Sequence, residues 1–331
     1  MDAEQEAVAR RLFEKSIITQ QQFAEVKAYR SLGIFSLHNE LQWLLYSAVL
    51  LFTSGAGILI YQNIDSVGHT AILALLLGMS LGFYGLSYKK SPGFDRAETH
   101  FDHPVYPYFV LLATILGATF IGYLQYQYKP FGERVEIATF FSAAVALAAA
   151  YYFDNRSALS IGITGLAATV GITATPGAIF NNNFLKHPSL LVSGIVLGTL
   201  LIVWAEYSER TNLKRHFSLV WVTFAQHLTG ICCVIGMAGD FWPAYVVVLA
   251  AVLFYCYRKS HVLDSASLFV FTLIYGYIAW NMVLFKLIDV LDAVLIYELL
   301  TFIAPLYFIA SIVFFIQSIK KFNRKSNDRL R

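Results

Sequence analysis

The chain has 331 residues, of which 57% are hydrophobic and only 14% are charged, and its mean hydropathy is +0.59. Soluble domains carry about 25% charged residues, so this chain cannot cover a water-facing surface of its size. The net charge is +3, and the charged side chains concentrate in residues 1–40 and 320–331. This composition excludes a soluble enzyme, a nucleic-acid-binding domain and a disordered protein. It predicts an all-α, polytopic integral membrane bundle.

Residues 1–38 are predicted to form a small cytoplasmic hairpin of two short helices. The second helix starts after Thr19, a good N-cap residue, and Gln22 follows at the spacing of a capping box. So small a hairpin buries too little surface to be stable alone. We therefore expect it to pack on the membrane surface, on the cytoplasmic loops or on another copy.

The stretch LFEKSIITQQQF, residues 12–23, resembles the hairpin of SHOCT-like modules and the start of a bacterial membrane-protein family, domain of unknown function 2157 (DUF2157). In that family a Gly-rich first span follows the hairpin, and this chain has Gly55 and Gly57 there. Ile64 stands where an aromatic residue is typical of the family. The resemblance implies a multi-pass protein of the bacterial cytoplasmic membrane with no established activity, so it assigns no catalytic residues and no cofactor.

Ten apolar runs then follow, and a helix needs about 20 such residues to cross a bilayer. They predict a ten-span bundle over residues 39–319 and a basic cytoplasmic tail over residues 320–331. The amphipathic stretch Lys286–Glu298 is interpreted as a short interfacial helix. The predicted spans are Leu41–Tyr61, Thr70–Tyr88, Tyr106–Tyr126, Val135–Phe153, Ala158–Ala174, Leu190–Tyr207, Phe217–Met237, Phe241–Tyr257, Ser267–Phe285 and Leu299–Ile319.

The distribution of Lys and Arg predicts the orientation. With the N-terminus in the cytoplasm, 20 of these residues lie in cytoplasmic segments and 4 in outer loops, as the positive-inside rule requires. Both termini are therefore expected inside.

Gly78/Gly82 and Gly194/Gly198 are GxxxG motifs, and Ala144/Ala148 is a further small-residue pair. We interpret them as helix-packing faces within the bundle, with a dimer face as the alternative.

Polar side chains inside spans are costly and are candidates for function. The predicted intramembrane polar site consists of Gln226, His227, Asn281 and Glu206. His227 titrates near neutral pH, which suits a proton relay or a substrate contact, whereas the alternative is a neutral histidine that fixes helix packing. Glu206 and Asp154 are expected to reach the interface or to pair with the nearby Arg210 and Arg156.

The loops offer two further groups of polar residues. Asn63, Asp65 and His69 are predicted to line the outer mouth of a site. The cytoplasmic segment ETHFDHP contains Glu98, His100, Asp102 and His103, which are oxygen and imidazole donors, but their spacing is not typical of a metal site and no metal is predicted. The three cysteines lie in apolar runs without ligand spacing.

Three functions remain open at this point. A small-solute transporter is favoured by ten spans and short loops. A scaffold or sensor would recruit a protein partner, or another copy, through residues 1–35. An intramembrane enzyme for lipid-linked substrates is disfavoured, because paired membrane-embedded carboxylates and a Ser/His constellation are missing. The expected partners are the lipid bilayer and a small solute, and no cofactor and no nucleic acid are expected.

Overall fold

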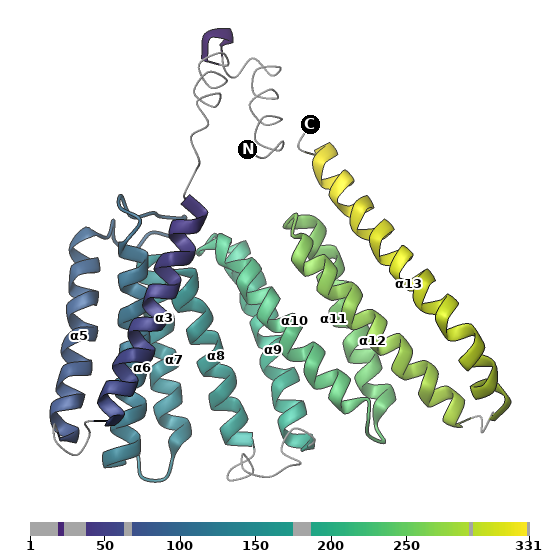
Figure 1. The fold of residues 1–331 in the computed structure, drawn as a ribbon, viewed down its shortest axis with the longest axis horizontal. Coiled ribbons are helices and arrows are strands. Elements are labelled where there is room, and N and C mark those ends of the chain that lie inside the picture. Colours follow the sequence, from purple (N-terminus) through teal and green to yellow (C-terminus); the bar gives the residue numbers. More distant parts are fainter. Residues whose placement is uncertain (1–18, 23–37, 63–67, 175–186, 291–293, 330–331) are drawn as a thin grey trace. The chain divides into compact units, whose positions relative to one another are not determined.

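The computed structural model describes residues 19–22, 38–62, 68–174, 187–290 and 294–329 (Figure 1). These residues form helices joined by short turns and loops, with no strand among them. The all-α prediction is therefore confirmed. The chain divides into two units, Met1–Leu59 and Ile60–Arg331, which are described separately.

In the first unit, the capping box predicted for the hairpin is present. The Thr19 amide donates to Gln22 Oε1 at 2.9 Å, and the Gln22 amide donates to Thr19 Oγ1 at 3.3 Å. The rest of the predicted hairpin lies outside the described residues. Helix α3, His38–Gln62, follows and contains the apolar run Leu41–Ile58.

The second unit is a row of helices in which sequence neighbours pack against each other in alternating directions (Figure 1). Because each span must satisfy its own backbone amides in lipid, apolar runs of this length form helices. The helices are α5 His69–Lys90, α6 Tyr106–Tyr128, α7 Val135–Phe153, α8 Arg156–Ala174, α9 Pro188–Arg210, α10 Ser218–Gly236 after a 3-10 turn at Arg215–Phe217, α11 Trp242–Val262, α12 Ala266–Val290 and α13 Val294–Arg329.

Each of the ten predicted runs falls on one of these long helices. Within the described residues, nine helices are long and apolar enough to cross a membrane, and α11 is not among them. Its ends contain Pro243 and the pair Arg258 and Lys259, which lower the hydropathy of an otherwise apolar helix. The chain is thus a multi-pass membrane protein, while the number ten and the orientation stay predictions.

The predicted interfacial helix at Lys286–Glu298 is not a separate element. Helix α12 continues through Lys286 to Val290, and α13 has already begun at Val294. Helix α13 also extends past the predicted last span to Arg329, so residues 320–329 of the basic tail are helical. An amphipathic segment that follows an apolar run can continue the same helix when it contains no Pro or Gly. Residues 286–290 of α12 and residues 320–329 of α13 do so.

Small residues bring neighbouring helices together, because lipid offers no hydrophobic force to do so. A Cβ on Gly194 would lie 2.5 Å from Cys232 Sγ, and one on Gly198 would collide with Thr229 Oγ1, so this GxxxG face packs against α10 as predicted. Cβ atoms on Gly78 and Gly82 would meet nothing within 4 Å in the described part of the chain.

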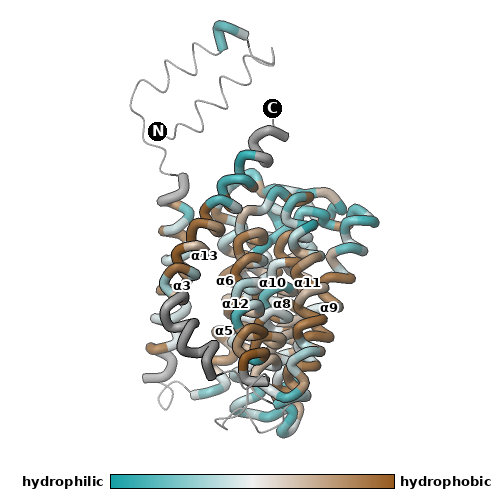
Figure 2. The backbone as a smooth tube through the Cα atoms, turned by 90° about the vertical axis from the view of Figure 1, so that its right-hand side faces the viewer, coloured by the Kyte–Doolittle hydropathy of each residue, from teal (hydrophilic) through white to brown (hydrophobic). Residues whose placement is uncertain are grey.

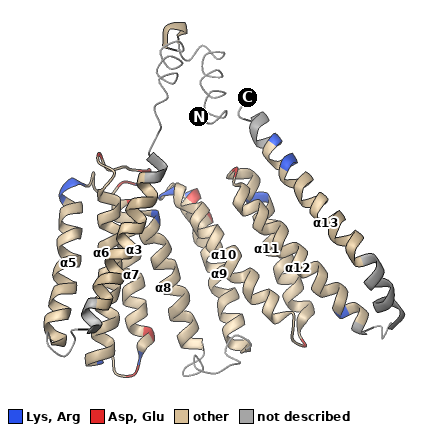
Figure 3. Cartoon of the chain, in the orientation of Figure 1, with Lys and Arg blue, Asp and Glu red and all other residues tan. Residues whose placement is uncertain are grey.

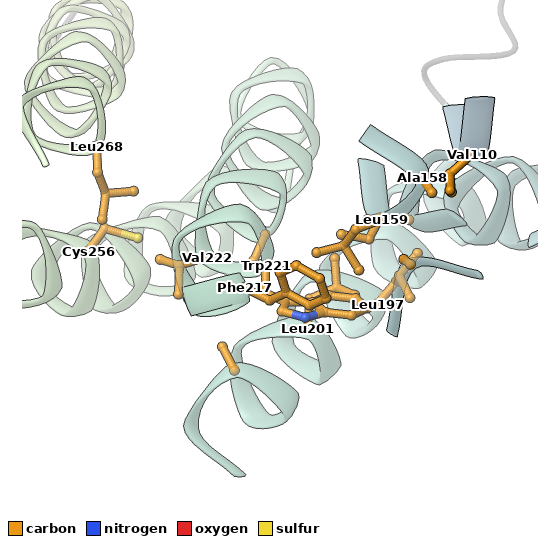
Figure 4. Close-up of a cluster of buried hydrophobic side chains, with 14 residues drawn as sticks. Val110, Ala158, Leu159, Leu197, Leu201, Phe217, Trp221, Val222, Cys256 and Leu268 are labelled. Carbon is orange, nitrogen blue, oxygen red and sulfur yellow. The ribbon is translucent and has the colours of Figure 1, made fainter. Parts of the chain in front are cut away.

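The interface between α7 and α8 uses a different alanine face from the predicted one. Ala143, Ala146 and Ala150 are buried there, whereas Ala144 and Ala148 are exposed. The buried cluster that joins α7, α8, α9 and α10 is centred on Leu159, Phe217, Trp221, Leu197 and Leu201 (Figure 4).

Hydrophobic residues occupy the middle of these helices and hydrophilic residues their ends (Figure 2). We call the end at which α5, α7, α9, α11 and α13 finish the basic end, because most described Lys and Arg residues of this unit lie there (Figure 3). These are Lys89, Lys90, Arg96, Arg156, Arg210, Lys214, Arg215, Arg258, Lys259, Lys320, Lys321 and Arg324.

Candidate functional site

A tight turn between α7 and α8 positions Asp154 at the basic end. Asp154 ends α7 in the left-handed conformation, with φ 54°. Asn155 fixes the turn: its Oδ1 accepts from the Ala158 amide at 2.9 Å, which caps α8, and its Nδ2 donates to the Pro107 carbonyl at 2.8 Å. The carboxylate is thereby held against the loop that precedes α6.

Lys214 reaches the same place from the loop between α9 and α10. It also adopts the left-handed conformation, with φ 51°, and its amide donates to the Arg96 carbonyl at 2.7 Å. Left-handed residues other than Gly are uncommon and cost free energy. The side chains of these two left-handed residues pair with each other, so the pair helps to stabilise both loops.

The side chains form a buried ionic group, which we call the Asp154 cluster: Asp154, Lys214, His216 and Thr99. Lys214 Nζ lies 2.8 Å from Asp154 Oδ2, and the exposed fractions of these side chains are 0% and 2%. The Thr99 amide donates to the same oxygen at 2.6 Å, and His216 Nε2 bonds the other oxygen, Oδ1.

Lys214 is fully satisfied by its surroundings. Besides Asp154, its ammonium lies 3.1 Å from the Ala97 carbonyl and 3.4 Å from Thr99 Oγ1, which accounts for its three donors. Burial alone would raise the pKa of Asp154, but the hydrogen bonds from Lys214, the Thr99 amide and His216 outweigh it and hold the pKa below its ordinary value of 3.8. The cluster is thus a compensated ion pair that ties three loops together.

A second ionic group, the Lys259 cluster, ties α9 to α11 at the same end. Lys259 Nζ lies 2.5 Å from Glu206 Oε1 and 2.8 Å from Glu209 Oε2. Tyr255 also donates to Glu206 at 2.7 Å, and Ser218 donates to Glu209. Glu206, predicted as part of the intramembrane site, therefore belongs to a different group of residues.

The expected pairing of Asp154 with Arg156 and of Glu206 with Arg210 is wrong as the principal contact. Arg156 instead bonds Glu98 at 2.9 Å, and both of these side chains are exposed. Sequence neighbours are the nearest cations along the chain, but a lysine from another segment can reach into a drier site, where an ionic contact is stronger.

The other three residues of the predicted polar site lie on α10 and α12. Gln226 is buried, and its Nε2 donates to Thr272 Oγ1 at 2.8 Å, while its Oε1 has no partner in the described structure. His227 is half-buried, with Nδ1 3.1 Å from the Tyr275 hydroxyl. Asn281 donates to the Tyr277 carbonyl of its own helix at 2.8 Å. Gln226 and His227 thus link α10 to α12, and a proton-relay or substrate-contact role for them stays a prediction.

Of the predicted outer mouth, only one residue can be placed. Asn63 and Asp65 lie outside the described residues. His69 begins α5, and its Nδ1 lies 2.7 Å from the Tyr123 hydroxyl of α6. The potential ligands of ETHFDHP do not converge either: among the described residues, no group of three or more His, Cys, Asp or Glu could hold a metal ion.

A feature that the sequence analysis missed is a crevice of about 500 Å³ between α6, α7 and α8, which we call the hydroxyl crevice. It extends from Ser160, in the second turn of α8 at the basic end, to Val135, the first residue of α7 at the opposite end. Ala and Gly leave the space open. Polar groups of Gln125, Thr139, Ser142, Ser160 and Thr164 line it.

The hydroxyl crevice had a signal in the sequence. Ser160 and Thr164 lie four residues apart on α8, and Thr139 and Ser142 lie three apart on α7, so each pair shares one helix face. The lining contains no Asp, Glu, Lys, Arg or His. The hydroxyls of Thr139, Ser160 and Thr164 donate to carbonyls of their own helices, so they can still accept a hydrogen bond from an uncharged polar molecule, and the lining offers no charge.

Comparison with known proteins gives one match. Residues 10–159 match the model of DUF2157, described as a predicted membrane protein family. The matched segment contains α3 to α7 and ends in α8, so it includes Asp154 and most of the walls of the hydroxyl crevice. No curated protein and no solved structure gives a match. Residues 10–159, just under half of the chain, are thus similar to the DUF2157 membrane-protein family, as the first residues predicted, whereas the likeness of the hairpin to SHOCT-like modules stays a prediction.

Proposed function

We propose that this multi-pass protein is a permease for small uncharged polar solutes, located in the bacterial cytoplasmic membrane with its basic end inside. The observation that carries the proposal is the hydroxyl crevice, which is lined by residues 135–143 of α7 and residues 160–168 of α8. Hydroxyl oxygens that accept hydrogen bonds can replace some of those that such a solute loses when it leaves water.

The composition of the crevice limits the solutes that it can take. Without an ionisable side chain on its wall, it cannot compensate a charged solute in a low-dielectric setting. The crevice opens on a flank at Gly122, which is exposed, so that transport requires this flank to be covered in the membrane. A second copy of the chain would be one such cover.

Solute flux into proteoliposomes tests the proposal. Purified protein is reconstituted, and stopped-flow light scattering follows the entry of glycerol, urea and a hexitol. Gly122 lines the crevice and a Cβ there would meet nothing within 4 Å, so we expect Gly122→Leu to be tolerated and to narrow the crevice. We expect wild-type vesicles to swell faster than protein-free vesicles, and Gly122→Leu to abolish most of this difference.

Gly85→Leu is the matched control, because a Cβ there also meets nothing within 4 Å and Gly85 lines no part of the crevice. It should leave flux unchanged. If His227→Ala stops flux while Gly122→Leu does not, the path lies between α10 and α12 instead. Flux equal to that of protein-free vesicles for every solute would reject the permease. If a cellular phenotype of the gene deletion then depends on residues 1–35 and not on the crevice, this result would support the scaffold or sensor function instead.

A further inference from the structure

A separate groove of about 820 Å³ lies on the second unit between α7, α8, α9 and α10. Its wall is almost entirely carbon, with Leu147, Leu197 and Leu200 farther from the basic end and Trp204, Tyr207 and Phe94 nearer to it. Leu200 and Phe94 are more than half exposed, so the groove is open to its surroundings. It shares no residue with the hydroxyl crevice.

The dimensions of the groove match one leaflet of a bilayer. Along α9 its lining runs from Leu197 to Tyr207, which at 1.5 Å per residue is about 15 Å. Half of a hydrocarbon core of roughly 30 Å is the same length. Trp204 and Tyr207 pack on each other near the basic end, at the depth where amphipathic rings meet the headgroups.

Cations surround the polar end of the groove. The backbone of Arg96 bonds that of Lys214, which places Arg96 and Arg215 on adjoining loops next to the lining residues Phe94 and Leu213. Arg210 follows Tyr207 by one turn of α9. All three arginines are exposed, and among the residues that the structure describes none of them has an acidic partner within 4 Å. Lys214 itself is paired within the Asp154 cluster, so the three arginines carry the accessible positive charge of this rim, and Arg210 also interacts with the nearby carboxylate of Glu206.

We infer that this groove binds an anionic phospholipid of the leaflet at the basic end, with an acyl chain against Leu197, Leu200 and Trp204. The phosphate then lies between Arg96, Arg210 and Arg215. Charge complementarity favours an anionic lipid over a zwitterionic one, because the rim provides three guanidinium groups against one exposed carboxylate outside the two clusters, that of Asp95. The inference is independent of the proposed permease.

Quenching of tryptophan fluorescence by brominated lipids tests the inference. A variant with Trp43, Trp242 and Trp280 changed to Phe retains two tryptophans, Trp204 and Trp221, both on the groove. It is reconstituted in mixed phosphatidylcholine and phosphatidylglycerol vesicles of constant composition, in which either lipid is the brominated one. Per molecule, brominated phosphatidylglycerol should quench at least about fivefold more effectively, the factor that one cation contributes near anionic headgroups.

Two sets of substitutions distinguish a binding site from general attraction of the basic end. Arg96→Gln, Arg210→Gln and Arg215→Gln together should remove the preference. The matched control, Arg258→Gln, Lys320→Gln and Lys321→Gln, removes three cations of the same end on α11 and α13 and should retain it. Equal quenching by both lipids in the parent variant would overturn the inference. So would a preference that survives loss of the three arginines, or absence of quenching because a second copy covers the groove.

Discussion

The pair of Asp154 and Lys214 shows how two opposite charges can be buried together in a membrane protein. Isolating either charge from water is expensive, and the attraction between them repays it only when all remaining donors and acceptors are used. Here the Thr99 amide, the Ala97 carbonyl and His216 complete the set. The pair therefore depends on three loops at once, and each loop depends on the pair.

We expect Asp154→Asn to lower the free energy of unfolding by about 3–5 kcal/mol, because it leaves the Lys214 ammonium buried without a counter-charge. Thermal unfolding in detergent measures this. Glu98→Gln is the control: it breaks the exposed pair with Arg156, which should cost below about 1 kcal/mol. Adding Lys214→Met to Asp154→Asn should restore much of the loss. If the double variant is as unstable as the single one, the pair is not the cause.

The same pair gives stability a pH dependence with a definite sign. Since the folded-state pKa of Asp154 lies below 3.8, its contribution is complete above 3.8 and is lost as the pH falls through the lower folded-state value. At pH values below 3.8, the thermal unfolding temperature of the wild type should therefore fall more steeply with decreasing pH than that of Asp154→Asn. Parallel curves for the two proteins would contradict the assignment.

At the scale of helices, contact is set by which small residues face a neighbour. The face of α9 with Gly194 and Gly198 lies on Cys232 and Thr229 of α10, with no room for a methyl group. The similar motif at Gly78 and Gly82 on α5 has open space around it in the described structure. The GxxxG spacing is therefore tightly packed in α9 and open in α5, and the difference depends on whether a partner helix lies against the motif.

Adding one methyl group to each motif tests this difference. Gly198→Ala should destabilise the protein by about 1–3 kcal/mol, because the new Cβ collides with Thr229 and crowds the Ala225 carbonyl. Gly82→Ala should be neutral or stabilise by about 0.5–1 kcal/mol, since alanine is the better helix former. Thermal unfolding in detergent compares them, and Thr229→Ala should partly rescue Gly198→Ala. Equal effects at both glycines would show that the α9–α10 contact is looser than described.

For the whole molecule, the direction of every helix after α10 depends on whether α11 crosses the bilayer. Its apolar centre is flanked by Phe241 and Trp242 at one end and by Arg258 and Lys259 at the other. Lys259 is already neutralised by Glu206 and Glu209, which reduces the cost of placing it near the membrane. We therefore expect α11 to be a span despite its lower hydropathy.

Labelling of single cysteines by an impermeant maleimide tests this topology. Cys232, Cys233 and Cys256 are buried and are first replaced by Ala. Asp240→Cys, just before α11, should react on intact cells, whereas Asp264→Cys, just after it, should react only once the membrane is opened. Reaction of both positions from one side would show that α11 does not cross and would remove the agreement with the positive-inside rule.

Much of the fold could be predicted because the length of an apolar run determines where a span can begin and end. The prediction Val135–Phe153 coincides with α7, and Tyr106–Tyr126 differs from α6 by two residues. The polar contacts could not be predicted in the same way. Asp154 was assigned to the nearest cation, Arg156, whereas its partner lies 60 residues further on, and the hydroxyl crevice exists only where three helices meet.

That separation of 60 residues has a consequence for biosynthesis. When Asp154 leaves the ribosome, the cation that will neutralise it has not yet been translated, and α8 and α9 must be inserted first. Until then its carboxylate stays hydrated at the surface, and the turn after α7 is held only by the contacts of Asn155 and by the end of the helix. Emergence of Lys214 then closes the three loops together, so nascent chains arrested before residue 214 should be cut by protease at this turn, and chains arrested well beyond it should resist.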